Sequence, residues 1–400
     1  MSAEPAEARL WEQPAVRAGI GGLVVAMYGL AWGRRTLQLA RNGWVDENGM
    51  PFGGDFITFW AAADLAVQGR ALDAFDPEIF FAVQDAALPG NAAHFLWNYP
   101  PTFHLFVLPL ALTDLVTATW LWWAVSIPIY LAVLWRVVPR AEAVVLGLAS
   151  SATLLNLAHG QNGFLLTAVF LGGIALVLRE RPVLGGLVLG CLAIKPHFGV
   201  LLPVALAVGR QPRAFAATAV SLGLWCAIST AVFGWAYWEA FLSNLSVVGE
   251  AIDTGDLSAD KLVTPYVLAR GLGLGSIAWL VQGGATLAAA GAVAWAFTRD
   301  RPWGASAVLL AATTLCSPYL FDYDLVLLVG AAACAAVDRF EHGHHPLEWT
   351  VWLGAGLGPV ALAPLSAATG IQAGPILTGA VVATCLAALL RPSEAPSDYA

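Results

Sequence analysis

The stretch Ala143–Leu178 reads AVVLGLASSATLLNLAHGQNGFLLTAVFLGGIALVL and contains no aspartate, glutamate, lysine or arginine. A helix needs roughly 20 apolar residues to cross the hydrocarbon core of a bilayer, so this stretch is long enough for two crossings. Its most polar run, His159-Gly160-Gln161-Asn162, lies between two apolar halves. The stretch therefore predicts two membrane helices that meet at a polar turn.

The rest of the chain has the same character. Its 400 residues are 58% hydrophobic and 12% charged, whereas a soluble domain usually carries about 25% charged residues. The other long uncharged stretches are Ala18–Gly33, Leu115–Trp135, Ala214–Trp238, Gly271–Thr298, Pro302–Phe321 and Trp349–Leu390. Because helices pair their own backbone groups inside lipid, we predict an all-α polytopic membrane protein. We expect a single integral membrane domain over residues 1–400, with roughly ten to thirteen transmembrane helices.

Charge separates the loops into two kinds. The short loops carry arginine in pairs: Arg136 and Arg140, Arg179 and Arg181, Arg210 and Arg213, Arg299 and Arg301. Residues 41–99 instead hold eight acids against two arginines, and residues 234–262 hold five acids against one lysine. Short basic loops stay in the cytoplasm. We therefore predict that residues 41–100 and 234–262 form the first and second extracytoplasmic loops.

The segment Pro101–Trp135 does not fit this topology as two full crossings. Two crossings would place Arg136 on the same side as the acidic loop that precedes them, against the rule that short basic loops are cytoplasmic. The sequence allows two explanations. Either the first part of the segment is short and re-entrant, or a later segment does not cross fully.

The first acidic loop has the composition of a folded segment. It spans about 60 residues, and connections of this length are usually functional or disordered. Eleven aromatic residues between Trp44 and Tyr99 argue against disorder. Residues recur at helical spacing in two places, at Ile57, Trp60, Ala61, Asp64 and Leu65 and at Ile79, Ala82, Val83 and Ala86. We predict two amphipathic helices that lie at the membrane surface.

Several classes of function are disfavoured. The net charge of −8 argues against a nucleic-acid partner. The sequence contains no P-loop, G-x-S-x-G or H-E-x-x-H motif, and the run His342-Gly343-His344-His345 has no partner ligands at periodic spacing. We therefore expect neither a metal site nor a cofactor. The five cysteines lie in apolar stretches and are predicted to be buried thiols. Since no basic region and cleavage site precede it, Ala18–Gly33 is predicted to be a retained first span.

Polar residues at the edge of an apolar bundle are costly, which makes them candidates for function. Asp55 follows two glycines and precedes a helical pattern, so it is either the N-cap of that helix or a functional carboxylate. The run Trp97-Asn98-Tyr99-Pro100-Pro101 is either a helix start at the interface or a binding segment. Gln161 and Asn162 can bind sugar hydroxyls or join helices to each other.

Two further candidate segments carry charge. Lys195 is one of two lysines in the chain and lies beside Pro196 and His197 at a break in the apolar pattern, which suggests a discontinuous helix. Its ammonium can pair with a phosphate or a buried acid, or extend to the interface. Further along, the run SPYLFDYD from Ser317 to Asp324 brings acids into an apolar stretch. These acids are either solvated residues at the end of a span or part of a site.

The order of these short motifs resembles one family. The set comprises G-D-F at Gly54–Phe56, Y-P-P at Tyr99–Pro101, G-Q-N at Gly160–Asn162, K-P at Lys195–Pro196 and S-P-Y-x-x-D-Y-D at Ser317–Asp324. It resembles the bacterial polytopic glycosyltransferases of family 87 (the DUF2029 group), and it is similar to mycobacterial polyprenol-phosphate-mannose-dependent α-1,2-mannosyltransferases. The resemblance runs from about Gly53 to Asp324 and implies a GT-C fold.

The resemblance also implies an activity. The chain would be an enzyme of the bacterial cytoplasmic membrane that moves a hexose or pentose, mannose first, from a polyprenyl-phosphate sugar donor to a lipid or glycan acceptor on the outer face. Asp55 would be the general base of an inverting transfer. A cation should stabilise the charge on the leaving phosphate; Lys195 is the first candidate, Arg270 the second, and His197 lies beside Lys195.

The resemblance assigns the remaining candidates to the substrates. The candidate contacts are Tyr99, Gln161, Asn162, Tyr323 and Asp324, with Asp64 as a secondary polar contact. The mannosyltransferases carry histidines after the S-P motif, where this chain has Tyr323 and Asp324. The identities of the sugar and the acceptor therefore stay open.

Two other functions are compatible with the same residues. A secondary transporter would use Asp55, Lys195, Asp322 and Asp324 as ion or proton sites, although the sequence has no clear internal repeat. A flippase or scaffold would bind polyprenyl-phosphate lipids and would tolerate the loss of Asp55.

Overall fold

The computed structural model describes residues 14–254, 260–343 and 347–391, and the elements in these ranges are helical. The α-helices of the first half are α1 (Pro14–Arg41), α2 (Phe56–Val67), α3 (Pro77–Ala87), α4 (Pro101–Val107), α5 (Leu115–Val137), α6 (Ala141–Ala149), α7 (Ser151–Ala158), α8 (Gly163–Leu178), α9 (Pro182–Gly190) and α10 (Leu202–Val208). Those of the second half are α11 (Pro212–Phe233), α12 (Trp235–Thr254), α13 (Pro265–Gly271), α14 (Ala278–Ala296), α15 (Pro302–Thr313), α16 (Leu327–His342), α17 (Glu348–Gly356), α18 (Gly358–Thr369) and α19 (Gly374–Leu389).

Short 3-10 helices join several of these elements. They are η2 (Ala71–Phe75), η3 (Leu108–Leu112), η4 (Cys191–Ile194), η5 (Pro196–Gly199), η6 (Gly275–Ile277) and η7 (Asp322–Val326). The β contacts in the described ranges are two isolated bridges, Val45 with Pro51 and Leu262 with Phe321. The predicted all-α class is confirmed, and the chain is a polytopic membrane protein. His344 and His345, from the histidine-rich run, lie outside the described residues.

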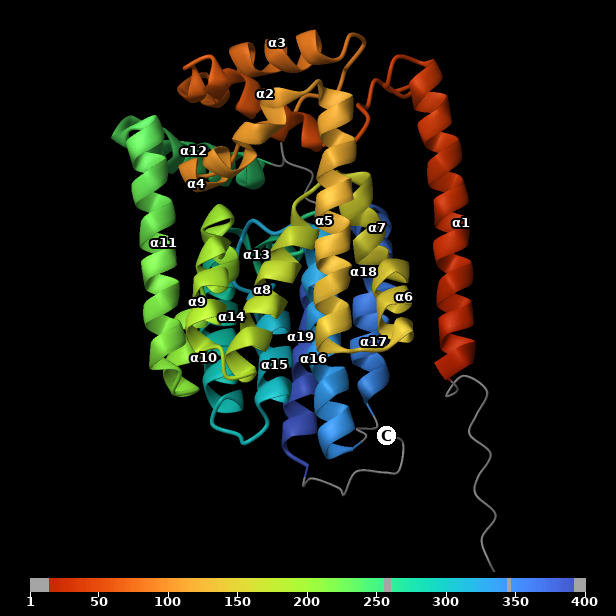
Figure 1. Cartoon of the computed structure of the whole chain (residues 1–400), viewed down its shortest axis with the longest axis vertical. Coiled ribbons are helices and arrows are strands. Elements are labelled where there is room, and N and C mark those ends of the chain that lie inside the picture. The colour runs from red at the N-terminus through yellow and green to blue at the C-terminus, as the bar shows by residue number, and fades with distance from the viewer. Residues whose placement is uncertain (1–13, 255–259, 344–346, 392–400) are drawn as a thin grey trace, which may run out of the picture.

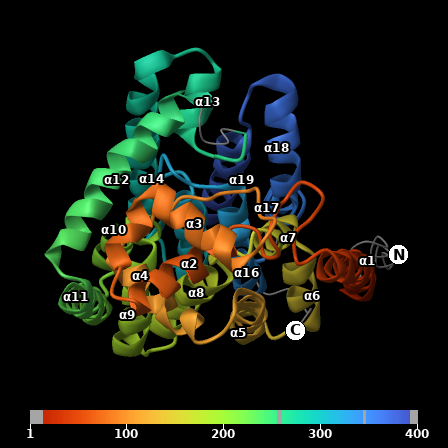
Figure 2. The ribbon, with the colours of Figure 1, turned by 90° about the horizontal axis from the view of Figure 1, so that it is seen from above.

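The helices form two layers. In Figure 1, α2, α3, α4 and α12 lie across the top of the molecule and most of the other helices run lengthwise below them. Figure 2, seen from above, shows the upper helices crossing over part of the lower bundle. Helices α2 and α3 come from the first predicted outer loop and α12 comes from the second. The two acidic segments, far apart in sequence, therefore build one layer.

Helix length gives fewer membrane crossings than the sequence predicts. In the part of the chain that the structure describes, four helices are long and apolar enough to span a bilayer: α1, α5, α11 and α14 extended by η6. The pairs α6–α7 and α17–α18, bent by 56° and 72°, raise this number to six if each pair is one span. The other apolar helices have 10–17 residues. Many of the apolar runs behind the expected ten to thirteen crossings are broken into short helices, as where η4 and η5 separate α9 from α10.

The segment Pro101–Trp135 is one short piece followed by one long helix. Helix α4 and η3 together form an apolar piece of fewer than 18 residues that belongs to the upper layer (Figure 1). Helix α5 then runs from that layer toward the opposite end of the molecule, carrying Arg136 in its last turn. The first of the two explanations, a short first part, therefore fits, and Arg136 lies away from the acidic loop.

Helix α2 lies inside the upper layer. The helical patterns predicted in the first outer loop are present as α2 and α3, but Ile57, Ala61 and Leu65 of α2 are fully buried. They pack within the protein because η2, α3, α4 and η3 all contact α2. The predicted position at the membrane surface is thus wrong for the apolar face of α2, which faces protein side chains.

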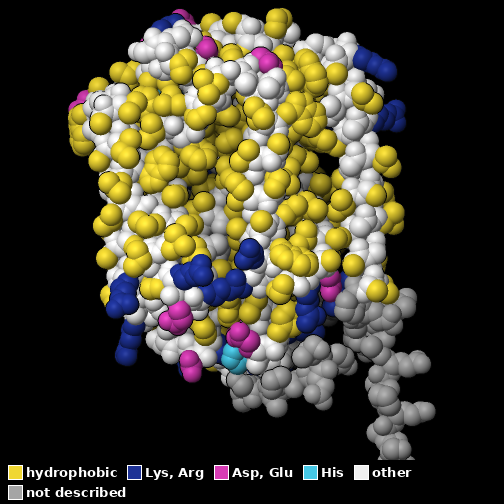
Figure 3. All heavy atoms as spheres, in the orientation of Figure 1, with side chains coloured by type: hydrophobic (Ala, Val, Ile, Leu, Met, Phe, Trp, Pro, Cys, Tyr) yellow, Lys and Arg dark blue, Asp and Glu magenta, His cyan; other side chains and the backbone are white. Residues whose placement is uncertain are grey.

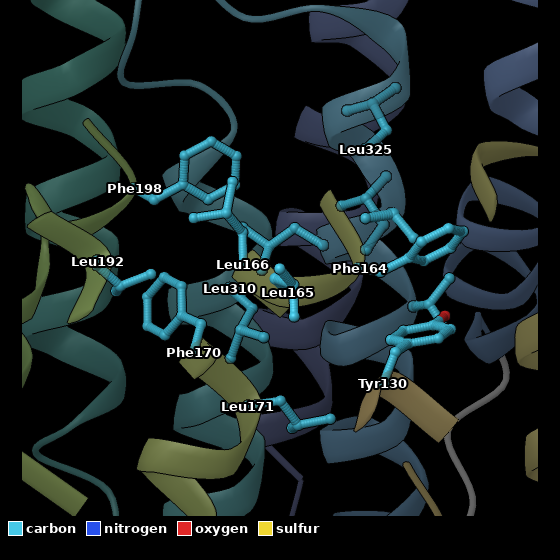
Figure 4. Close-up of a cluster of buried hydrophobic side chains, with 14 of the residues drawn as sticks. Tyr130, Phe164, Leu165, Leu166, Phe170, Leu171, Leu192, Phe198, Leu310 and Leu325 are labelled. Atoms are coloured by element: carbon cyan, nitrogen blue, oxygen red, sulfur yellow. The ribbon is translucent and has the colours of Figure 1, made fainter. Parts of the chain in front are cut away.

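Helix α8 forms the centre of the lower bundle. Most of its residues are buried, and it is apolar on every face, as expected for a core helix. Figure 4 shows Phe164 and Phe170 of α8 packed among Tyr130 of α5, Leu192 of η4 and Leu310 of α15. This packing fixes the N-terminus of α8, and with it the polar segment His159–Asn162, directly below the upper layer.

Charge is distributed as the topology prediction requires. On the face shown in Figure 3, hydrophobic side chains cover the middle of the molecule and most of the Lys and Arg side chains lie near its lower end. At that end the C-termini of α5 and α8 meet, since Nη2 of Arg179 donates to the carbonyl oxygen of Arg136 at 2.5 Å. The arginine-bearing loops and the acidic upper layer therefore occupy opposite ends.

Candidate active site

Asp55 lies at the start of α2, directly after a two-glycine turn. Gly53 and Gly54 have φ angles of 82° and 56°, a region that favours glycine. Asp55 itself is helical, with φ −63° and ψ −13°, and its side chain makes no capping hydrogen bond. The carboxylate therefore does not cap α2, which was one of the two possibilities that the sequence left open. Its side chain is 18% exposed.

The Asp55 carboxylate is held by the segment between α7 and α8. Nε2 of Gln161 donates to Oδ2 of Asp55 at 2.9 Å, and Oε1 of Gln161 accepts from the Tyr99 hydroxyl at 3.1 Å. The other oxygen, Oδ1, lies 3.6 Å from Nδ1 of His159. Three segments far apart in sequence thus meet at one carboxylate.

Two glycine-containing loops interlock to set this geometry. Gly160 has a φ of 59°, and a Cβ there would collide with the carbonyl oxygen of Gly53. In return, a Cβ on Gly54 would lie 3.2 Å from Cα of His159, tighter than an ordinary contact. The missing side chains let the two backbones touch, and this contact brings Gln161 and His159 to Asp55.

A buried ion pair forms the second part of the site. Nζ of Lys195 lies 2.6 Å from Oδ1 of Asp324, and the two side chains are only 6% and 0% exposed. Lys195 stands at the break between η4 and η5, and Asp324 is in η7. The ammonium also lies 5.6 Å from the ring centre of Tyr323. The predicted discontinuity at Lys195 is present, and a carboxylate neutralises the cation.

Tyrosine side chains connect the Asp55 carboxylate to the ion pair. Burial raises the pKa of Tyr99 well above its ordinary value, and the nearby charges of Asp324 and Asp55 raise that pKa further. Burial likewise raises the pKa of Tyr323, which feels the same two carboxylates. Both phenols therefore stay neutral and can donate hydrogen bonds at physiological pH. Asp55, Lys195 and Asp324 belong to one polar cluster below the upper layer.

The outer rim of the cluster is tied to α12. Nδ2 of Asn98 donates to the Tyr319 hydroxyl at 3.2 Å, and Oδ1 of Asn98 accepts from Nδ2 of Asn244 at 2.8 Å. Asn244 also donates to the carbonyl oxygen of Trp97 at 3.2 Å. The second acidic segment thus borders the site through Asn244.

Other predicted site residues lie outside this cluster or at its edge. Asp64 accepts from Nε2 of Gln68 at 2.7 Å, near the far end of α2 from Asp55. Arg270 is exposed in the last turn of α13. The His197 ring lies 5.0 Å from that of Phe198 at a tilt of 49°, and its Nε2 has no hydrogen-bond partner among the described residues. Asn162 is fully buried beside Gln161, and neither of its amide atoms has a partner in the same part of the chain.

Sequence reasoning selected six members of the cluster and missed others. The six that meet are Asp55, Tyr99, Gln161, Lys195, Tyr323 and Asp324. The missed ones are His159, Asn98, Tyr319 and Asn244. His159, Asn98 and Tyr319 are adjacent or close to selected residues, which could have flagged them. Asn244 lies in a helix with no motif, and only the fold brings it to the site.

The arrangement suits proton removal next to an anion. It offers a partly exposed carboxylate, neutral phenol and amide donors, and a buried ammonium with hydrogen-bonding capacity. Within the described residues, no group of three or more His, Cys, Asp or Glu side chains is arranged to hold a metal ion. The side chains present can therefore assist a displacement in which a hydroxyl loses its proton and an anion leaves.

Comparison with known proteins points to one family. Residues 97–318, more than half of the chain, match the family model described as glycosyltransferase family 87. The matched range contains Tyr99, Gln161 and Lys195, while Asp55 precedes it and Asp324 follows it. Comparisons with curated proteins and with solved structures return no match.

Proposed function

The chain belongs to glycosyltransferase family 87, and we propose that it transfers a sugar from a polyprenyl-phosphate donor to a hydroxyl group of a lipid or glycan acceptor. Mannose is the first choice of sugar among hexoses and pentoses. We also propose a GT-C fold, with the reaction on the extracytoplasmic face of the bacterial cytoplasmic membrane. The observation that carries the proposal is the Asp55 carboxylate, held by Gln161 in the same cluster as the Lys195–Asp324 pair.

Asp55 is the proposed general base. In an inverting transfer the acceptor oxygen attacks the anomeric carbon from the face opposite the leaving phosphate, and its proton must be removed as the new bond forms. Gln161 occupies Oδ2 of Asp55 at 2.9 Å. Oδ1 accepts no hydrogen bond from the described residues and is available for the acceptor hydroxyl. The O–H bond of the acceptor breaks as the Asp55 carboxyl O–H forms.

Lys195 is the proposed electrostatic partner of the leaving group. The bond between the anomeric carbon and the phosphate oxygen breaks, and the polyprenyl phosphate carries away the electron pair and the negative charge. An ammonium has three donor hydrogens, so Lys195 can bond a phosphate oxygen while it keeps its contact with Asp324 at 2.6 Å. Stabilisation of a developing charge by a prearranged donor is usually a large part of catalysis.

The phenol and amide groups are the proposed sugar contacts. Tyr99 and Tyr323 are neutral donors between Asp55 and Asp324. Neutral donors can bond sugar hydroxyls without attracting counter-ions into the site. The opposite placement of arginine-bearing loops (Figure 3) supports an outward-facing site, because short basic loops stay in the cytoplasm.

The donor class can be tested with the purified protein in liposomes. Radiolabelled mannose would be offered on polyprenyl phosphate and, separately, on a nucleotide, with octyl α-mannoside and octyl β-glucoside as acceptors. We expect a labelled glycoside product from the lipid-linked donor alone. Product from the nucleotide donor alone would contradict the proposal. Movement of the lipid across the bilayer without any glycoside product would favour the flippase alternative.

A further inference from the structure

His159 occupies a defined position between Asp55 and η7. It is the C-cap residue of α7, and its side chain is 22% exposed. Its Nδ1 lies 3.6 Å from Oδ1 of Asp55, and its ring centre lies 5.4 Å from that of Tyr323. This distance to Asp55 is longer than a hydrogen bond, so the two groups are adjacent without being hydrogen-bonded.

We propose that His159 supports catalysis through Asp55. After each transfer, it takes from Asp55 the proton that came from the acceptor hydroxyl, and it passes this proton to water. The inference rests on the proposed role of Asp55 as general base. In the step itself, the O–H bond at Oδ1 of Asp55 breaks and an N–H bond forms at Nδ1 of His159. The resulting imidazolium then releases its Nε2 proton to water, which leaves the Nδ1–H tautomer. Exchange with water, which takes the Nδ1 proton and returns one to Nε2, restores both side chains to their starting forms.

Asp55 needs such a partner because each turnover leaves it protonated. Its carboxylate is 18% exposed and is held on its other side by Gln161, whose amide can donate a proton in a hydrogen bond but cannot carry one away. Imidazole exchanges protons readily near neutral pH. A movement of the ring by well under ~1 Å would bring Nδ1 within hydrogen-bonding distance of Oδ1.

Asp322 of η7 is a second carboxylate near His159. Its side chain is 2% exposed, and Oδ1 of Asp322 accepts from the backbone N–H of Tyr323 at 2.8 Å. Burial raises the pKa of Asp322 to about 6, while the charges of His159 and Lys261 lower it. Two carboxylates, Asp55 and Asp322, are thus near the His159 ring.

Among the described elements packed against α7, η7 also carries Asp324, which pairs with Lys195 at 2.6 Å. Helices α8 and α18 also pack on α7, and neither carries an Asp, Glu, Lys or Arg side chain. Helices α6 and α17 carry Glu142 and Glu348, which pair with Arg17 at 2.6 Å and with Arg339 at 3.4 Å. Glycine at position 54 lets its loop approach Cα of His159, which fixes the spacing to Asp55.

The inference can be tested with His159→Gln and His159→Phe in the full-length protein, measured over pH 5 to 8. Phenylalanine keeps the ring next to Tyr323 but has no nitrogen. The matched control is His94→Gln. His94 lies 2.8 Å from Asp85 and forms an exposed imidazole–carboxylate pair in the first acidic segment, which also contains Asp55. We expect both His159 variants to lower kcat about 10- to 100-fold at pH 7.5 with KM little changed, and the control to have no effect.

The pH profile separates proton transfer from packing. A protonated imidazole cannot accept a proton, so the wild-type rate should fall toward pH 5 and the gap to His159→Gln should narrow. A gap that is constant across pH, or full activity of His159→Phe, would overturn the inference.

The Asp55→Asn variant distinguishes this inference from the function on which it depends. If Asp55→Asn transfers sugar at the wild-type rate, the proposed base itself is wrong. If Asp55→Asn is inactive while His159→Gln behaves like wild type, only the role of His159 is wrong. We expect His159→Gln to cost nothing further in the Asp55→Asn background.

Discussion

The charged groups of the polar cluster are the partly exposed Asp55 carboxylate and the buried pair of Lys195 and Asp324. Asp55, Lys195 and Asp324 could be selected because charged residues in an apolar chain are costly. The sequence left Asp55 divided between capping and function, since Asp is common at both. The two roles are distinguished by the hydrogen bond that Gln161 donates to Asp55, two residues that lie 106 positions apart in the sequence. No local pattern predicts such a contact, and for the same reason His159 was passed over beside Gln161.

The Lys195–Asp324 pair makes a prediction about stability. Replacing one partner of a buried ion pair leaves the other charge unpaired, which costs about 3–5 kcal/mol. We expect Lys195→Met to lower the midpoint of thermal unfolding in detergent by several degrees. The double variant Lys195→Met/Asp324→Leu should recover much of that loss, because it removes both charges. An unchanged midpoint for Lys195→Met would mean that the two side chains are not paired in the folded protein.

At the level of helices and loops, the sequence predicted several of the elements that position the site. The apolar runs, the two helices of the first outer loop and the break at Lys195 were all recoverable from periodicity and proline positions. Helix lengths were not, because other apolar runs are also divided: Ala143–Leu178 forms parts of α6, α7 and α8, and Trp349–Leu390 forms parts of α17, α18 and α19. The buried face of α2 was also misplaced, since apolar spacing alone does not distinguish contact with lipid from contact with protein.

The interlock of the two glycine loops makes a prediction for Gly160→Ala. The φ of 59° and the collision of a Cβ with the Gly53 carbonyl should push His159 and Gln161 away from Asp55. We expect sugar transfer to fall at least about 10-fold, as small misplacements at reacting groups are costly. The measurement is the initial transfer rate of the folded, monodisperse variant.

Gly223→Ala provides the control for this change. It lies within α11, and a Cβ there would meet no atom within 4 Å. In a helix interior this substitution is expected to be neutral or to stabilise by about 0.5–1 kcal/mol. If Gly160→Ala were as active as Gly223→Ala, the close approach of the loops would not be needed for the site.

The whole molecule has two ends of different charge. The acidic segments build one layer and the arginine-bearing loops lie at the other end (Figures 1 and 3). The charges of the loops predicted this separation. The position of Arg136 had conflicted with it, and the conflict disappears because α4 and η3 form only a short apolar piece before α5. The family match over residues 97–318 includes α4 to α15, but it begins after α2 and ends before η7. The site is therefore completed by segments on both sides of the matched range.

Orientation can be measured by labelling single cysteines in intact cells. Glu78 is exposed at the start of α3, and Arg213 is exposed at the start of α11. We expect a membrane-impermeant maleimide to label Glu78→Cys in intact cells, and Arg213→Cys only after permeabilisation. The parent chain, whose five cysteines lie in apolar segments, provides the background. The reverse pattern would place the candidate site on the cytoplasmic side.

The assignment of Asp55 as general base is tested most directly by comparing the rates of sugar transfer by Asp55→Asn and Asp85→Asn. Both acids lie in the first acidic segment, but the exposed Asp85 pairs with His94 and makes no contact with the polar cluster among the described hydrogen bonds. With a radiolabelled polyprenyl-phosphate mannose donor, we predict a loss of about 10²- to 10⁴-fold for Asp55→Asn, the usual contribution of a general base, and a rate near wild type for Asp85→Asn. Equal, undiminished rates for the two variants would contradict the account.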